Sequence, residues 1–489
     1  MSSDLFRLPG YIISCKIKNQ EILAEDYINL VYDRINKIDV KINSFISKNY
    51  EAAIQKARKI DKKIKNNEKT GSMVGIPIGI KDNISVKGLK NTCASKILQG
   101  YESPYDATVI DRLKDQDAII IGKLNMDEFG MGTTSEFSFY GEVHNPWNID
   151  YVAGGSSGGS AAVVSSLQVP ISLGSDTGGS IRCPSSFCSV IGMKPTYGTV
   201  SRFGLVSYSN SLEQIGPIAK TVTDIVLTLN AICGNDPNDN TTLNKQFEYK
   251  VNKIDEILSK NYNVGVLNNL IHNSEEQVAK TIYDKIDMLK ENGFNVKDTS
   301  INYSDFALAA YYIIATAEAS SNLSRFDNIR YGFDFDPEGY EWNSYSSHIR
   351  SNFGDEVKRR ILVGSFVLSA GYYGKYYLKA QKIRNIIKSE FNRLFKFFDV
   401  LVLPTMPILP FKIGERGSAP LELYNLDIYT ILANLAGIPA ISIPAGFSKE
   451  GLPIGLQILS NEFNEQILLD IAIFFEQKDK FSEWNPVPI

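Results

Sequence analysis

The chain of 489 residues is longer than a common domain, and its 43% hydrophobic and 22% charged residues are typical of a globular protein. A net charge of −4, with 51 basic residues spread along the sequence, argues against a protein that holds nucleic acid by itself. Five scattered cysteines and three distant histidines argue against a disulfide framework and against a metal site. There is no secretory pattern and no run of roughly 20 apolar residues, so we expect a cytoplasmic protein without a membrane span.

Amphipathic helices open the chain. Apolar residues at helical spacing predict helices over 19–45 and 50–66, and both are expected to pack on the outside of a core. Near residue 70 the sequence changes to apolar, strand-like character. We therefore predict an N-terminal helical region, 1–70, packed on a main domain, 71–489.

A lysine ends the first predicted strand, 74–84, whose sequence is VGIPIGIKDNI. A buried lysine is costly when charged and tends to lose its proton, so Lys81 is a candidate base. The alternative is a lysine at a strand end that reaches solvent, which is the usual fate of this residue type.

The rest of the chain alternates strands with helices, which predicts an α/β fold with a mixed central sheet covered by helices on both faces. The irregular stretch 123–148 is long enough to suggest a functional loop, 194–221 reads as a further loop, and the aromatic stretch 331–349 suggests a lid or pocket wall. The other predicted elements are a helix at 106–117, a strand at 118–122, a helix at 222–233, a strand at 262–267, a helix at 274–292, a strand from 295, helices at 304–326 and 355–396, strands at 400–403, 440–444 and 454–459, and a helix at 463–477.

Two Gly-Gly-Ser units lie within 153–196 and end at Ser156 and Ser180. Tandem glycines let the backbone approach another group closely, so each unit can present a hydroxyl with amide N–H groups beside it. Nucleophilic attack on a carbonyl needs such an arrangement together with a proton acceptor. A flexible linker fits badly because apolar residues surround both units, and neither unit carries a phosphate-binding motif.

These motifs resemble the amidase signature family. The resemblance rests on GIPIGIKDN around Lys81, GGSSGGS around Ser156 and GSDTGGSIR around Ser180, and it extends from about residue 5 to 485. It implies a single large α/β catalytic domain in which Ser180 is the acyl nucleophile, Ser156 relays the proton and Lys81 is the neutral base. It also implies an oxyanion hole made by the backbone N–H groups of Thr177, Gly178, Gly179 and Ser180.

Further stretches are similar to one branch of the family, the glutaminase subunits of tRNA-dependent amidotransferases: NMDEFGMGT, GMKPTYG, VSRFGL, EASSNLS, VKRRI and GYY. This likeness implies free glutamine as substrate, with Arg360 binding its carboxylate, Asp427 its ammonium group and Tyr311 lining the pocket. Arg359 competes with Arg360, and each charged residue could instead form a surface ion pair. Ser189 stands where glycine is expected and Thr199 where a basic residue is expected, and neither is catalytic.

The same likeness implies partner proteins. The chain has no P-loop, so ATP and Mg²⁺ are expected in a larger, tRNA-binding and kinase-like B subunit, together with a small C subunit, and no cofactor is expected in this chain. tRNA would be held mainly through the partner. The alternatives are a stand-alone amidase acting on another small amide, and a scaffold without activity.

Overall fold

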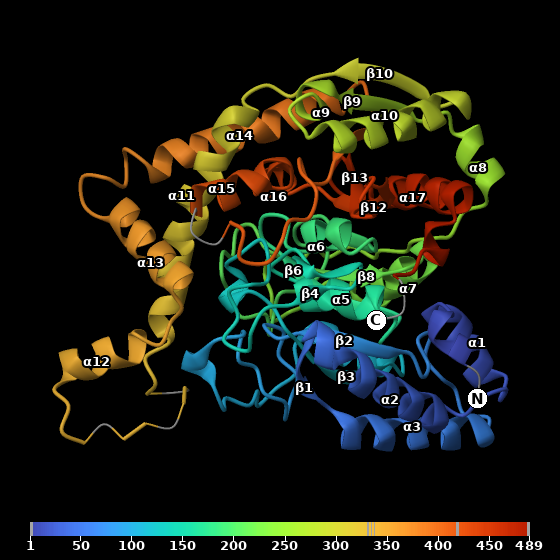
Figure 1. Ribbon diagram of the computed structural model, residues 1–489, viewed down its shortest axis with the longest axis horizontal. Helices are drawn as coiled ribbons and strands as arrows, with labels where there is room; N and C mark the ends of the chain where they lie inside the picture. The colour runs from blue at the N-terminus through green and yellow to red at the C-terminus, as the bar shows by residue number, and fades with distance from the viewer. Residues whose placement is uncertain (1–2, 330–331, 334, 337, 417–419, 487–489) are drawn as a thin grey trace.

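The computed structural model describes residues 3–329, 332–333, 335–336, 338–416 and 420–486 (Figure 1). Within them, eleven strands form one mixed sheet in the order β1-β3-β2-β6-β8-β7-β12-β13-β11-β9-β10, and β4 and β5 form a separate pair. The strands are β1 (Phe45–Lys48), β2 (Pro77–Lys81), β3 (Ile119–Leu124), β4 (His144–Asn145), β5 (Asn148–Val152), β6 (Ile171–Asp176), β7 (Ile191–Lys194), β8 (Gln214–Ala219), β9 (Asn263–Leu267), β10 (Asn295–Thr299), β11 (Val400–Pro404), β12 (Ala440–Phe447) and β13 (Pro453–Ser460).

Helices cover both faces of this sheet, and no helix among the described residues is long and apolar enough to cross a membrane. The α-helices are α1 (Gly10–Lys18), α2 (Ala24–Ile42), α3 (Tyr50–Lys65), α4 (Thr108–Asp115), α5 (Gly158–Ser165), α6 (Arg182–Phe187), α7 (Val222–Ile232), α8 (Ile254–Ser259), α9 (Asn268–Ile271), α10 (Glu276–Glu291), α11 (Ser304–Asn322), α12 (Trp342–Arg350), α13 (Asp355–Leu368), α14 (Tyr377–Leu394), α15 (Pro420–Asn425), α16 (Ile431–Ala436) and α17 (Glu465–Asp479). Single 3₁₀ turns lie at Ser3–Arg7, Lys96–Leu98, Glu128–Gly130, Leu323–Arg325, Leu426–Tyr429 and Phe481–Glu483.

The strands explain why both faces are covered. Successive residues of a strand point to opposite faces, and in β11 both sets are apolar and buried. Val400 and Val402 join the core with α7, α10 and α17, whereas Leu401 and Leu403 join the core with α11, α14 and α16. The predicted α/β fold with a mixed sheet between helical layers is therefore confirmed.

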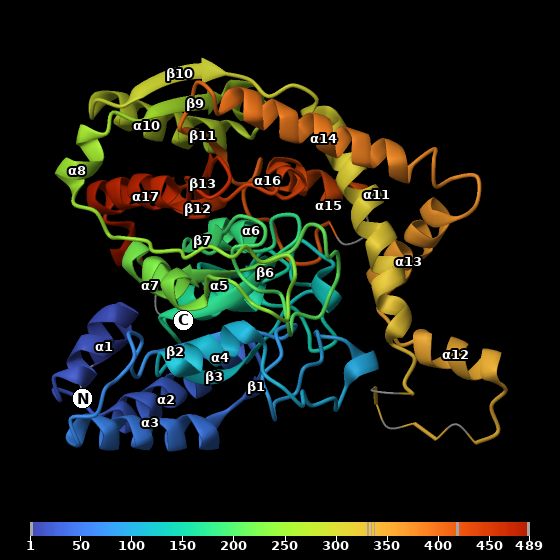
Figure 2. The same ribbon diagram turned by 180° about the vertical axis from the view of Figure 1, so that it is seen from behind.

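The N-terminal helices lie at the β1 end of the sheet, opposite β9 and β10 (Figure 2). The helix predicted over 19–45 is too long, because Asn43 adopts a left-handed conformation that ends α2, and β1 then joins the sheet. α1 was not predicted, because its first amides are capped by the distant carboxylate of Asp224 on α7, at 2.9 and 2.8 Å. The division at residue 70 stays a prediction.

Three further expectations are corrected or limited. The helix predicted over 355–396 is two helices, α13 and α14, because the chain turns at Gly371, whose φ is +86°. The loop predicted over 194–221 contains the buried strand β8, whose Gly216 and Pro217 obscure it since both are unfavourable inside a strand. Of the lid predicted over 331–349, residues 331, 334 and 337 lie outside the described residues, and its second half forms α12.

Candidate active site

Lys81 ends β2, a strand inside the sheet between β3 and β6, and it is fully buried. Its Nζ lies 2.8 Å from Ser156 Oγ and 2.9 Å from Ser175 Oγ. Burial lowers the pKa of Lys81 to about 7, against the opposing influence of Asp127 and Asp176. The burial of Lys81 excludes the alternative in which this lysine reaches solvent. The lowered pKa means that a substantial fraction of Lys81 is neutral near pH 7, as a base requires.

Ser156 lies in the turn between β5 and α5, and the Gly155–Ser156 peptide bond is cis. Glycine is needed at 155 because a Cβ there would lie 2.1 Å from Asp127 Oδ2. Asp127 in turn accepts hydrogen bonds from the amides of Ser135 and Phe137. The buried carboxylate of Asp127 therefore holds the predicted loop 123–148 together and packs it against the turn that carries Ser156.

Ser180 lies in the turn after β6, and this second Gly-Gly-Ser unit contacts the first. The amide of Ser157 donates a hydrogen bond to the carbonyl of Ser180 at 3.0 Å. This backbone contact brings the turns that carry Ser156 and Ser180 together. That the two serines act with Lys81 stays a prediction from the family resemblance. Ser180 remains slightly exposed, whereas Lys81 is fully enclosed.

The amides around Ser180 revise the predicted oxyanion hole. Gly179 adopts a φ of +130°, and its N–H already donates to Asp176 Oδ1 at 2.9 Å. One N–H cannot donate well to both Asp176 and an oxyanion. Of the four amides predicted for the oxyanion hole, those of Thr177, Gly178 and Ser180 therefore remain as candidates.

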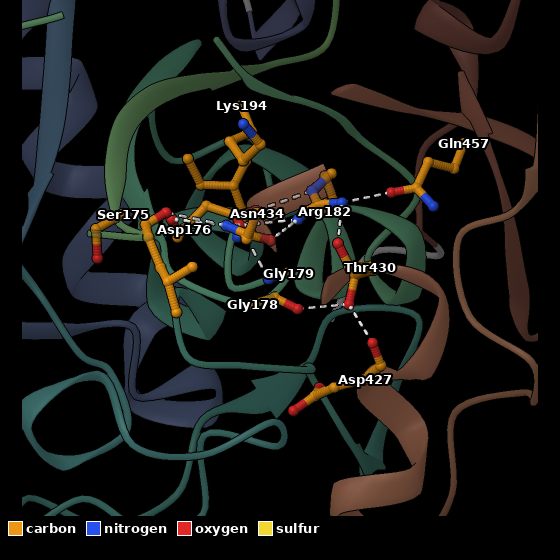
Figure 3. Close-up of polar contacts among 12 residues, drawn as sticks. Ser175, Asp176, Gly178, Gly179, Arg182, Lys194, Asp427, Thr430, Asn434 and Gln457 are labelled. Carbon is orange, nitrogen blue, oxygen red and sulfur yellow. Dashed lines mark hydrogen bonds and ion pairs between the residues drawn. The ribbon is translucent and has the colours of Figure 1, made fainter. Parts of the chain in front are cut away.

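A buried ionic network holds this turn and was not predicted in detail (Figure 3). Arg182 Nη2 pairs with Asp176 Oδ1 at 2.9 Å, and both side chains are fully buried. The Arg182 guanidinium also donates to the Thr430 carbonyl, Gln457 Oε1 and Asn434 Oδ1, at 2.6 to 2.8 Å. Although burial alone would raise the pKa of Asp176, Arg182 holds it below its usual value. The sequence does hint at this network, because Asp176 and Arg182 carry opposite charges on either side of the Gly178-Gly179 turn within an otherwise apolar stretch.

Arg360 lies on α13 and is buried among aromatic rings. Its Nε donates to Glu356 Oε1 at 2.7 Å and its Nη1 to the Tyr208 hydroxyl at 2.6 Å. The rings of Tyr208, Tyr312 and Tyr424 lie 5.3 to 5.7 Å from the guanidinium carbon. Sequence reasoning missed the three tyrosines, because they come from three other parts of the chain, whereas Glu356 lies one turn before Arg360 on α13.

Asp427 lies in the 3₁₀ turn Leu426–Tyr429 and shares a neighbour with Arg360. It accepts hydrogen bonds from the Tyr312 hydroxyl at 2.8 Å and from Thr133 Oγ1 at 3.1 Å. Burial raises the pKa of Asp427 to about 7. Three residues later, Thr430 Oγ1 donates to the Gly178 carbonyl at 2.6 Å, which ties this segment to the Ser180 turn.

Tyr311 is buried against the same turn, since a Cβ at Gly178 would lie 2.3 Å from the Tyr311 hydroxyl. A cavity of about 290 Å³ is lined by Gly132, Thr133, Phe137, Asp355, Glu356, Arg359, Arg360, Leu423 and Tyr424. Both competing arginines line it and both pair with Glu356, but Arg359 is part-exposed whereas Arg360 is buried. The geometry favours Arg360 as the substrate ligand. Its guanidinium lies over the ring of Tyr312, and the hydroxyl of the same tyrosine donates a hydrogen bond to Asp427.

Ser189 and Thr199, the two residues that differ from those expected in the family, are both buried. Ser189 adopts a φ of +54°, in the left-handed region that favours glycine, which is the residue expected there. Its buried hydroxyl has no hydrogen-bond partner among the described residues. Thr199 is buried, and its amide donates to the Thr196 carbonyl.

An α/β sheet with a buried lysine–serine pair beside a glycine turn agrees with the resemblance seen in the sequence. The model of the family described as Amidase matches residues 26–469, and the chain belongs to the amidase signature family. The A subunit of glutamyl-tRNA(Gln) amidotransferase from Clostridium botulinum (strain Loch Maree / Type A3) is 47% identical over 480 residues, 98% of each chain. The protein of the same name from Saccharolobus solfataricus is 48% identical over 464 residues, which cover 94% of this chain and 95% of that one. The crystal structure of the corresponding protein from Thermotoga maritima is 39% identical, has a TM-score of 0.82 and covers 99% and 98% of the two chains.

Proposed function

We propose that this chain is the glutamine-hydrolysing component of a tRNA-dependent amidotransferase that amidates Glu-tRNA(Gln), with Asp-tRNA(Asn) as a further substrate where the tRNA-binding partner accepts it. One observation carries the proposal: Arg360 and Asp427 share Tyr312 beside the Ser180 turn. An arginine and a carboxylate spaced in this way suit the α-carboxylate and α-ammonium groups of a free amino acid. The names of the relatives at 47 and 48% identity support the same function.

In the proposed reaction, Ser180 Oγ attacks the side-chain carbonyl carbon of glutamine. Its proton passes through Ser156 to neutral Lys81, and the oxyanion is held by the amides of Thr177, Gly178 and Ser180. Collapse of the intermediate breaks the C–N bond, and the proton returns from Lys81 through Ser156 to the departing ammonia. Water then hydrolyses the ester on Ser180 and releases glutamate. The Lys81–Ser156 distance of 2.8 Å supports this route.

Partner proteins complete the proposed activity. The ammonia would be used by a larger, tRNA-binding B subunit that activates the tRNA-linked carboxylate with ATP and Mg²⁺, in a complex with a small C subunit. This chain has no P-loop, which is consistent with that division of labour. Such an assembly would act in the cytoplasm and contact tRNA mainly through its larger B subunit.

A glutaminase assay with and without the cognate partners and charged tRNA tests the proposal. We expect glutamine hydrolysis that rises strongly in the complex, and loss of it in Ser180→Ala. The competing function, a stand-alone amidase, predicts full activity of the isolated chain on other amides and none on glutamine. An Arg360→Ala variant that hydrolyses glutamine with an unchanged KM would show that the glutamine pocket is wrongly assigned.

A further inference from the structure

Helix α13 is apolar on two faces, and only one of them is covered. Val357, Gly364 and Val367 are buried on α11, where a Cβ at Gly364 would lie 1.9 Å from the Thr316 carbonyl oxygen. On the other side, Leu362, Val363 and Phe366 are 71, 45 and 49% exposed. A contiguous exposed apolar patch commonly marks an interaction site, so the second face indicates a missing neighbour.

The exposed apolar surface continues into the turn after α13. The ring centroid of Phe366 lies 4.3 Å from that of Tyr372, and Tyr373 is also exposed. We name Leu362, Val363, Phe366, Leu368, Tyr372 and Tyr373 the α13 face. In both views α13 lies at the outer margin of the molecule, away from the central sheet (Figures 1 and 2).

Positive charge lies beside the α13 face. Residues 357–389 contain eight Lys or Arg and no Asp or Glu. Lys358, Arg359, Arg360 and Lys388 pair with acidic side chains outside this stretch. Arg384 is partly buried, so the exposed basic rim consists of Lys375, Lys379 and Lys382. Lys375 Nζ lies 6.0 Å from the ring of Tyr372, and Lys379 and Lys382 are exposed on α14. An apolar centre with a charged rim is the usual organisation of a protein interface.

This combination distinguishes between occupants. A second copy of the chain would bring the same lysines together, which costs free energy through like-charge repulsion. RNA could contact the lysines through its phosphates and stack its bases on the tyrosines, but it would leave the aliphatic side chains of Leu362 and Val363 without a matching partner. A protein segment with an apolar stripe and acidic flanks satisfies both the apolar centre and the rim.

We propose that the α13 face docks an acidic, amphipathic segment of a partner protein in the amidotransferase complex. The inference rests on the proposed function, because it supplies the partners, and it adds where one of them binds. The basic rim would guide the encounter, and the apolar centre would hold the complex once it has formed.

The test titrates the cognate large and small subunits into the purified chain and measures Kd. Phe366→Glu and Leu362→Glu should each weaken binding by about 30-fold or more, as expected for central interface residues. Val40→Glu is the matched control, because Val40 is 81% exposed on α2, at the other end of the molecule, and should change Kd by less than about twofold. Lys379→Glu should weaken binding mainly at low salt. Glutamine hydrolysis and the melting temperature of the isolated variants should match the unaltered chain.

The outcomes separate this inference from the proposed function. If the unaltered chain does not bind the cognate subunits, the proposed function fails and the docking surface with it. If the unaltered chain binds and both glutamate variants bind equally well, only the docking surface is wrong. Loss of binding to a tRNA transcript, or conversion of a homodimer to a monomer, with partner binding intact would also overturn it, in favour of RNA or of a second copy.

Discussion

Asp427→Asn should change the pH dependence of glutamine hydrolysis. Asparagine keeps an oxygen that can accept the hydrogen bonds from Tyr312 and Thr133, but it removes the charge proposed to bind the substrate ammonium group. Losing one partner of a buried charge pair typically costs about 3 kcal/mol, so kcat/KM at pH 8 should fall roughly 100-fold, mostly through KM.

The pH profile follows from two buried groups. The pKa of Lys81 is lowered to about 7 and that of Asp427 is raised to about 7, both by burial, with Arg360 and Asp176 acting on Asp427 in opposite directions. Lys81 must be neutral and Asp427 ionised, so acid disables both groups. At pH 6 each is about one-eleventh active, which leaves roughly 1/120 of the plateau kcat/KM.

The assay is steady-state glutamine hydrolysis between pH 5.5 and 8. Below pH 7, log kcat/KM of the unaltered chain should rise with a slope approaching 2, and that of Asp427→Asn with a slope approaching 1. In both proteins kcat should follow a single ionisation, that of Lys81. Equal slopes in the two proteins, or an unchanged KM in the variant, would refute the assignment of Asp427.

Two stability predictions concern residues outside the substrate pocket. Arg182→Met leaves Asp176 buried without its counter-ion and should lower the free energy of unfolding by about 4 kcal/mol in denaturant titrations. The control Lys388→Met breaks the more exposed pair with Glu462 and should cost under about 1 kcal/mol, so equal losses would contradict a buried network. Ser189→Gly should stabilise the chain by about 1 kcal/mol, because it relieves left-handed backbone and removes a buried hydroxyl without a partner. A lower melting temperature for this variant would show that the hydroxyl has a role.

Local sequence was enough to predict features with short-range causes. The apolar strand ending at Lys81 made this lysine a candidate base, with a solvent-exposed lysine as the alternative, and the resemblance to the amidase signature family implied its place beside the two serines. The structure places the lysine and both Gly-Gly-Ser turns together. The alternation of strands and helices predicted the sheet and its two helical layers.

Features with long-range causes could not be read in this way. The cap of α1 comes from Asp224, more than 200 residues away, and the tyrosines around Arg360 come from three other parts of the chain. The use of the Gly179 amide by Asp176 depends on backbone direction, which the motif does not reveal. The break between α13 and α14 was visible as two glycines, but the apolar pattern on both sides concealed it.

The central claim is that Ser180 is the nucleophile and that its pocket takes glutamine. Mass spectrometry after treatment with an electrophilic glutamine analogue tests it most directly. We expect one adduct on Ser180, prevented by excess glutamine and strongly reduced in Lys81→Met, which removes the base but keeps an apolar side chain of similar length. An unlabelled Ser180, or labelling that glutamine does not prevent, would contradict the account.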